Sequence, residues 1–293
     1  MFLFFLTFTV TLVFSLLIPD HAYAWGPATH IYLGVEILKD VSVLSPAVAA
    51  ILTKFPYDFL YGCISADITV GKKYIQYHKH CHNWNIGFKI LAEAQSTAQK
   101  AFAFGYLTHL AADTVAHNFF VPGHMISSYS TKSLGHTYWE IRADSLIRRK
   151  YWHEFEKIDK EVQKTHDRLI RTIVERTIFP FDVNKGIFNG IMMINRLKQW
   201  RQIVRGLTSF SQWDLGLEDI KKYHRLSTLL ILDLLISFEH AECLKLDPTG
   251  KANIRSAMKI KKSLKRLALG SRLNDSTYQS VVRQLPVQYP FFE

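Results

Sequence analysis

The chain has 293 residues, 48% of them hydrophobic, and a formal net charge of +11 at pH 7. This length allows one large core without requiring two, and three cysteines are too few for a disulfide framework. The positive charge favours acidic partners such as anionic lipid headgroups, nucleic acid or lipopolysaccharide-like polymers, without choosing among them. Cys63, Cys81 and Cys243 are too widely spaced for a zinc ribbon, although a single disulfide between Cys63 and Cys81 could form.

Residues 1–24 form an apolar leader that ends in Ala22-Tyr23-Ala24, the small-x-small pattern of a signal-peptidase site. An uncleaved membrane anchor is the alternative, because the apolar stretch approaches the minimum length that spans a bilayer. The cleavage pattern favours removal. We therefore predict a signal peptide at 1–24, a mature chain that begins at Trp25, and a secreted or periplasmic location.

Helical periodicity recurs after the leader, and strand signals are scarce. The expected helices cover residues 30–38, 43–55, a short stretch around Asp67, 88–121, 136–156, 158–177, 187–207, 226–238 and 254–269. Pro122-Gly123 should end the longest of them, and a serine-rich loop should follow at 127–135. The pattern predicts an all-α single domain of several helices over 25–293, with a ligand-bearing part at about 25–156 and a helical extension at about 157–293.

The last predicted helix, 254–269, is strongly basic and amphipathic (IRSAMKIKKSLKRLAL). Such a helix more often packs its leucines on a core, but it can also dock on an anionic bilayer, and both interpretations stay open. Peripheral contact with an anionic membrane surface is therefore considered, whereas nothing implies a stable protein partner. The chain has no Gly-x-Ser-x-Gly elbow and no phosphate-binding glycine-rich loop.

Residue types that bind metals recur at helical spacing in the first half of the chain. His109, Asp113 and His117 stand four residues apart in AFAFGYLTHLAADTVAHNFF, so their side chains share one stripe of a helix. An otherwise apolar helix buries such groups only when they pair with one another or bind a cation. The stripe alone fits a hydrogen-bonded His-Asp-His row equally well. His136 and Glu140 repeat the spacing in GHTYWEI, although a lone pair of this kind is more often at the surface.

Two further candidates lie between the first helices. Asp67, in CISADI, could be a ligand or a helix cap. His82 lies in HKHCHNW beside His78 and His80, and any of the three could be the ligand. The joint occurrence of these residues is more informative than any one of them. Nitrogen and oxygen ligands without thiolates are typical of zinc at catalytic sites.

The predicted mature N-terminus completes a recognisable order. The free amine and carbonyl of Trp25 can chelate a metal, and His30 follows five residues later. The order Trp, His, Asp, His, His-x-x-x-Asp, His, His-x-x-x-Glu resembles the zinc-dependent phospholipase C family and its relatives, the P1/S1-type nucleases. WGPATHIYLGVEIL is similar to the family's mature N-terminus, ISAD to its first aspartate motif and GYLTHLAADTVAHNFF to its central helix. The resemblance covers about 25–140.

The resemblance implies a site of three zinc ions, held by the amine and carbonyl of the first residue and by histidine and acidic side chains. The implied ligands are Trp25, His30, Asp67, His82, His109, Asp113, His117, His136 and Glu140. Asp113 would bridge two ions, and Asp67 is also the implied base for the attacking water. The family usually has five residues between its helix aspartate and the next histidine, whereas Asp113 and His117 are separated by three. His124 is the alternative, and we favour His117 because it stays on the ligand stripe.

The implied activity is that of a zinc-dependent phosphodiesterase acting on phospholipids. Glu140 resembles the lipases, because the nucleases generally have Asp there, whereas the spacing of Trp25 and His30 also occurs in the nucleases. Ile68 and Lys79 replace the aromatic residues that contact choline, so a preference for choline lipids is not expected. The alternatives are a P1/S1-type single-strand nuclease and a non-catalytic metal- or lipid-binding envelope protein.

Overall fold

The computed structural model describes residues 25–69, 81–131, 136–174, 179–196 and 215–287, together with the single positions 202, 204, 206 and 213. Throughout these residues every regular element is helical and no strand occurs, so the all-α prediction is confirmed. The predicted signal peptide, as well as His78, Lys79 and His80, lies outside the described residues.

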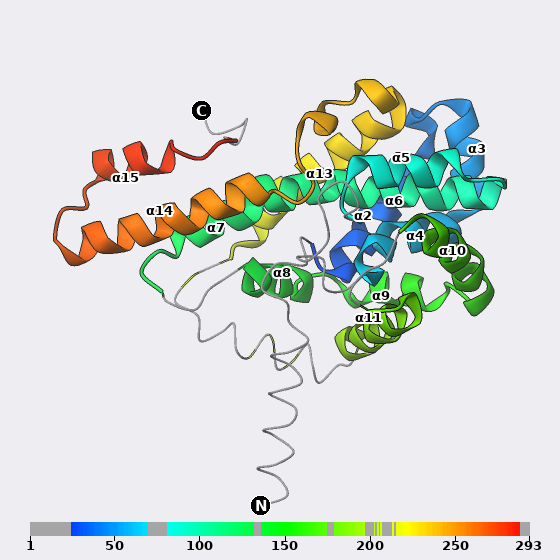
Figure 1. Cartoon of the computed structure of the whole chain (residues 1–293), viewed down its shortest axis with the longest axis horizontal. Helices are drawn as coiled ribbons and strands as arrows, with labels where there is room; N and C mark the ends of the chain where they lie inside the picture. The colour runs from blue at the N-terminus through cyan, green and yellow to red at the C-terminus, as the bar shows by residue number, and fades with distance from the viewer. Residues whose placement is uncertain are drawn as a thin grey trace, which may run out of the picture.

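The described residues form a series of helices of ordinary length (Figure 1). They are α2 (Pro27–Lys39), α3 (Pro46–Lys54), α4 (Pro56–Ser65), α5 (Trp84–Ala92), α6 (Thr97–Val115), α7 (Val121–Ser127), α8 (His136–Ser145), α9 (Arg149–Glu156), α10 (Lys160–Ile173), α11 (Phe181–Arg196), α13 (Leu217–Ser237), α14 (Lys251–Leu269) and α15 (Asp275–Val282). Short helical turns are η1 (Val41–Val43), η2 (Ala66–Ile68), η5 (Ala116–Phe120), η6 (Phe238–His240) and η7 (Glu242–Lys245).

Helix α6 is the centre of the core. Every residue from Ala101 to Val115 is buried, because α2, α3, α4, α5 and α13 all pack against this helix. A helix that is covered on all sides must be apolar nearly all round, and the Ala-, Leu- and Phe-rich segment has that composition. The histidine and the aspartate of this segment, His109 and Asp113, are therefore shut off from water.

Helices α4 and α6 cross with their backbones in direct contact. A Cβ atom on Gly62 would overlap the carbonyl of Phe102, and one on Gly105 would overlap the carbonyl of Phe59. The two helix backbones therefore touch, which only glycine allows. This contact fixes the end of α4, from which η2 and Asp67 continue.

Replacing Gly105 should loosen this crossing. We expect Gly105→Ala to lower the free energy of unfolding by about 1–3 kcal/mol or more, because backbone atoms must move to admit the methyl group. Urea unfolding of the zinc-free protein measures the effect. The control is Gly186→Ala on α11, where a Cβ has no neighbour within 4 Å. Equal stability of the two variants would contradict the close crossing.

The expected helix 88–121 is wrong in two respects. It is divided between α5 and α6, because Ser96 and Gln99 form a capping box that starts α6. The Ser96 hydroxyl accepts a hydrogen bond from the backbone amide of Gln99 at 3.1 Å. The Gln99 side chain accepts one from the backbone amide of Ser96 at 3.2 Å. Nor does Pro122 stop the helix. The π-helical turn η5 precedes it, and Pro122 lies in the first turn of α7, where its missing N–H is tolerated.

The expected helix 136–156 is also divided, into α8 and α9. Near the break, the Ser145 hydroxyl donates to the carbonyl of Arg142 at 2.7 Å, and the amide of Ile147 turns back to the carbonyl of Asp144 at 3.1 Å. Such local bonds compete with helix continuation. The other predicted helices occur with shifted ends, and the parts of 158–177 and 187–207 beyond α10 and α11 lie largely outside the described residues.

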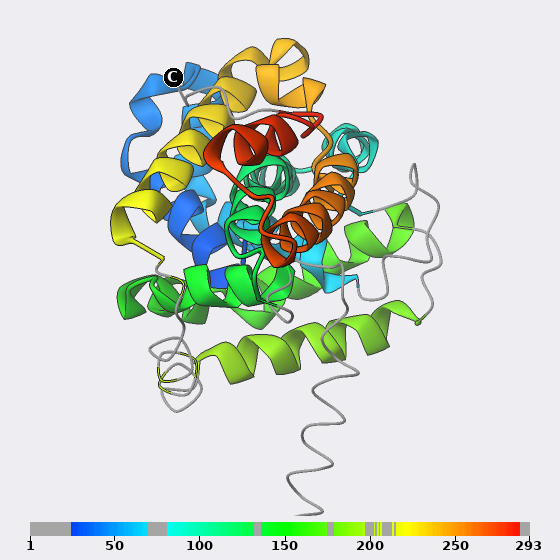
Figure 2. The same cartoon turned by 90° about the vertical axis from the view of Figure 1, so that its left-hand side faces the viewer.

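The carboxyl-terminal helices α14 and α15 form one end of the molecule, with α14 alongside α7 (Figures 1 and 2). The apolar residues Ile254, Ala257, Ile260 and Leu264 of α14 are buried in this packing. The amphipathic segment 254–269 therefore packs its apolar face on the core. In the described part of the chain, no single helix has the length and apolar composition to cross a membrane; α3 with α4–η2 qualifies only as a pair, bent by 92°.

Candidate metal centre

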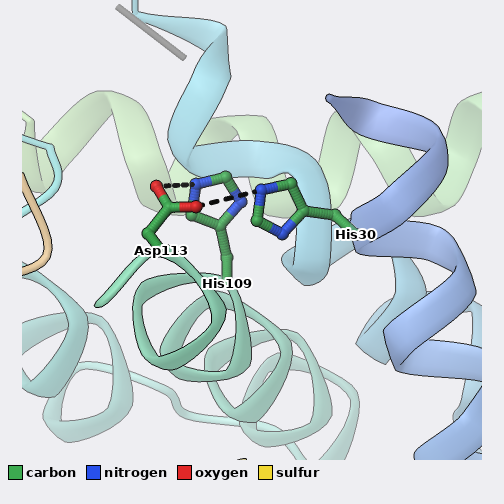
Figure 3. A group of neighbouring side chains, drawn as sticks. All are labelled: His30, His109 and Asp113. Carbon is green, nitrogen blue, oxygen red and sulfur yellow. Dashed lines mark ion pairs between the residues drawn. The ribbon is translucent and has the colours of Figure 1, made fainter. Parts of the chain in front are cut away.

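Three of the predicted ligands meet between α2 and α6. His109 and Asp113 project from α6, and His30 reaches them from α2 (Figure 3). Asp113 Oδ1 lies 3.2 Å from His30 Nε2, and its Oδ2 lies 3.2 Å from His109 Nε2. The imidazole rings of His30 and His109 stack with their centroids 3.9 Å apart. One carboxylate thus faces two imidazoles from different helices.

His82 and Asp67 extend this group. His82 Nε2 lies 3.0 Å from Asp113 Oδ2, 3.0 Å from His109 Nε2 and 3.3 Å from Asp67 Oδ1. His30, Asp67, His82, His109 and Asp113 are called the five-residue cluster below. It contains two overlapping sets with metal-site spacing, which share His109.

His117, His136 and Glu140 form a separate three-residue cluster. Their ligand atoms lie within 4.8 Å of one another, and His136 Nε2 is 2.8 Å from Glu140 Oε1. His117 comes from η5 and the other two from α8. The alternative residue, His124, instead stacks on Trp139 with ring centroids 4.8 Å apart. The structure thus brings His117, rather than His124, to this cluster.

The pKa values of His30, His117 and Asp113 favour the protonation states that bind metals. None of the eight side chains in the two clusters is more than 6% exposed. Burial lowers the pKa of His30 to about 4, and burial likewise lowers the pKa of His117 to about 4. Burial disfavours the charged form of Asp113, yet the surrounding histidines, His109 foremost, hold its pKa well below the usual value. Neutral imidazoles beside an ionised carboxylate are the form that metal ions require.

The unsatisfied atoms of the five-residue cluster fit a cation. His30 Nε2 and both carboxylate oxygens of Asp113 are buried and make no hydrogen bond of acceptable geometry. The Nδ1 of His109 lies 2.8 Å from the carbonyl oxygen of Cys63 and must donate to it, so His109 Nε2 carries the lone pair. That lone pair points towards His82 and Asp113. The buried oxygens of Asp113 are costly in a core unless a cation joins them.

The donor set is nitrogen and oxygen, as zinc at catalytic sites prefers. The three cysteines are buried and reduced, so the disulfide considered between Cys63 and Cys81 is not formed. Burial raises the pKa of the Cys63 and Cys243 thiols, which makes these two poor thiolate ligands.

Trp25 packs against the carboxyl-terminal part of α6 and against η5. Its indole is fully buried and donates to the carbonyl of Ala112 at 3.1 Å, and its ring packs on Phe120 with centroids 4.6 Å apart. These contacts hold the start of the predicted mature chain against the α6 segment that carries Asp113. Chelation by the amine of Trp25 requires removal of the leader and stays a prediction.

Asp144 also positions this end of the chain, and the sequence analysis missed it. Its buried carboxylate accepts hydrogen bonds from the amides of Ala28 and Thr29, at 3.2 and 2.7 Å, and from the Thr29 hydroxyl at 3.0 Å. Burial raises its pKa to about 6, although these hydrogen bonds oppose the rise. The carboxylate caps the first turn of α2, which carries His30. The sequence feature that could have identified Asp144 is its position four residues after Glu140 on the same helix.

Comparison with known proteins indicates the family of the chain. Residues 29–179, just over half of the chain, match the model of the family described as zinc dependent phospholipase C. An uncharacterized protein of Archaeoglobus fulgidus is 31% identical over 144 residues, which is 45% of this chain and 38% of that protein. The aligned part thus spans well under half of this relative. No solved structure matches the chain.

Proposed function

The chain belongs to the zinc-dependent phospholipase C family, and we propose that it hydrolyses phosphodiester bonds of phospholipids. The observation that carries the proposal is the convergence of eight buried imidazoles and carboxylates into metal-site geometry around a helix that is otherwise apolar. Five of these side chains come from α2, η2, the segment before α5, and α6; the other three come from η5 and α8.

We assign three zinc ions to these clusters. Trp25, His30 and Asp113 would hold the first ion, and His82, His109 and Asp67 the second, with Asp113 bridging the two. His117, His136 and Glu140 would hold the third. The three sets of ligand atoms within 4.8 Å of one another support a count of three ions, and the closeness of Asp113 to His30, His82 and His109 supports a bridging role.

The chemistry follows from these positions. Bound zinc would supply Lewis acidity, which stabilises charge on the phosphoryl oxygens and makes an attacking water more acidic. Asp67 lies at the edge of the five-residue cluster, 3.3 Å from His82, on a turn held by α4. From there its carboxylate would orient the attacking water and accept its proton.

We propose that the protein is exported and that its mature chain begins at Trp25, because only a free α-amine chelates together with its own carbonyl. One alanine inserted ahead of Trp25 in the mature protein should therefore remove one zinc ion and most of the activity. Intact-mass measurement of the exported protein and elemental analysis of the extended variant provide the test. A natural start at another residue, with full zinc content, would refute this proposal.

The substrate class is tested by direct comparison of lipids with nucleic acid. Zinc-loaded protein is assayed on phosphatidylcholine, phosphatidylethanolamine and phosphatidylglycerol vesicles beside heat-denatured DNA. We expect diacylglycerol release to exceed nucleotide release, because Glu140 matches the lipase-like acid of the family. Choline lipids should not be preferred over the other two. Rapid DNA hydrolysis with inert lipids would instead establish the nuclease alternative, and zinc binding without either activity would indicate a non-catalytic envelope protein.

Contact with an anionic membrane would depend on charge rather than on insertion. The apolar face of α14 is used in the core, whereas Lys251, Arg255, Lys259, Lys262 and Arg266 are exposed along the opposite face. We propose a peripheral, electrostatic association of this face with anionic lipid. It should weaken as salt rises, since such attraction is screened over ~10 Å near 0.1 M salt.

A further inference from the structure

The segment between η7 and α14 reaches back across the molecule to the metal centre. Three successive carbonyls of this segment accept hydrogen bonds from the first half of the chain. Leu246 O accepts from the Trp84 indole at 2.9 Å, Asp247 O from the Asn118 amide group at 2.9 Å, and Pro248 O from His117 Nδ1 at 2.5 Å. The Pro248 carbonyl thus contacts His117, a member of the three-residue cluster, directly.

The bond to Pro248 determines which nitrogen of His117 is available. A carbonyl only accepts, so Nδ1 of His117 must carry a hydrogen. Nε2 of the neutral ring then has the lone pair for the cluster with His136 and Glu140. A histidine that binds a metal ion is commonly oriented by such a bond to its other nitrogen.

Hydrogen bonds within the segment stabilise the turn that contains the Pro248 carbonyl. The Asp247 carboxylate accepts from the amide and hydroxyl of Thr249 at 2.9 and 2.7 Å, and the Asp247 carbonyl accepts from the amide of Gly250 at 2.9 Å. Gly250 has a φ of 53°, the left-handed region that favours glycine. A Cβ on Gly250 would overlap the backbone and Cβ of His117.

Asn253 of α14 stabilises the position of this turn through three hydrogen bonds. The buried Asn253 side chain donates to the carbonyl of Asn118 at 2.7 Å and to that of Val287 at 2.9 Å, and accepts from the Val287 amide at 2.9 Å. Hydrogen bonds with Asn118 of η5 therefore hold the chain at Asp247, before Pro248, and at Asn253, after it.

We propose that residues 246–250 are a positioning element for the third metal site: the Pro248 carbonyl selects the tautomer of His117 and orients its ring, and Gly250 allows the required approach. The inference rests on zinc binding by the three-residue cluster, as in the proposed function, but not on any substrate. It also gives the carboxyl-terminal part of the chain, which lies beyond the segment matched by the family model, a direct role at the metal centre.

The test compares Gly250→Ala with Gly270→Ala at the opposite end of α14, where a Cβ meets no atom closer than 3.5 Å. We measure zinc per chain, the chelator concentration that releases each ion, and the melting temperature of the zinc-free proteins. Gly250→Ala should lose one ion selectively, at a roughly 10–100-fold lower chelator concentration. Gly270→Ala should match the wild type. In a His117→Ala background, Gly250→Ala should cause no further loss of zinc.

Asn118→Ala is a second variant in case Gly250→Ala does not fold, because it removes the bond to Asp247 without adding an atom. It should weaken the same single ion. If the variants that fold release all their zinc as the wild type does, or lose every ion equally, the positioning role is wrong. Wild-type protein that binds no zinc would instead refute the proposed function itself.

Discussion

Asp113→Asn should remove more than one of the three zinc ions and reduce phosphodiesterase activity to background. The substitution keeps the size of the side chain but removes a negative charge that lies 3.0–3.2 Å from the nitrogens of His30, His82 and His109. Two ions that share this carboxylate would lose their common counter-charge in a buried site, where no water can replace it. Elemental analysis after mild dialysis, with activity on bis-p-nitrophenyl phosphate, measures both effects.

The thermal stability of the same variant gives an independent readout. Zinc that binds only the folded state raises the melting temperature, and chelation of the wild type should remove that increase. The increase should be much smaller for Asp113→Asn. Asp182→Asn, at an exposed position on α11, should behave as the wild type. Unchanged zinc content in Asp113→Asn would show that this carboxylate does not bridge two ions.

The family, the all-α fold and the membership of the two clusters could be predicted because each depends on residue type and spacing. Helical spacing placed His109 and Asp113 on one face of α6, and His136 next to Glu140 on α8. The choice of His117 over His124 rested on the same argument. The structure places His117 beside His136 and Glu140, and His117 lies in a π-helical turn rather than in a regular helix.

Contacts between residues distant in sequence could not be predicted in the same way. Nothing near Pro248 suggests that its carbonyl meets a histidine 131 positions earlier, and the approach of Cys63 to His109 depends on two glycines on different helices. The division of the expected helix 88–121 is a different kind of error. Ser96 and Gln99 have the spacing of a capping box, but the continuous apolar pattern favoured one helix.

Asp67→Asn should separate catalysis from metal binding. If Asp67 serves mainly as the base, the variant should keep most of its zinc and lose ~10²-fold or more in turnover, the scale expected when a general base is removed. The structure allows this separation because Asp67 lies 3.3 Å from His82 at the edge of the five-residue cluster, on η2, whereas Asp113 lies at its centre on α6.

The measurement pairs zinc content with the rate on bis-p-nitrophenyl phosphate over a range of pH. An asparagine can still hold a water by hydrogen bonding but cannot accept its proton, so the residual rate should rise with pH as hydroxide replaces the missing base. Asp113→Asn, which loses zinc as well as rate, is the matched comparison. Parallel loss of zinc and rate in Asp67→Asn would mean that Asp67 is chiefly a ligand. The proton would then have to pass to another group of the five-residue cluster or directly to solvent.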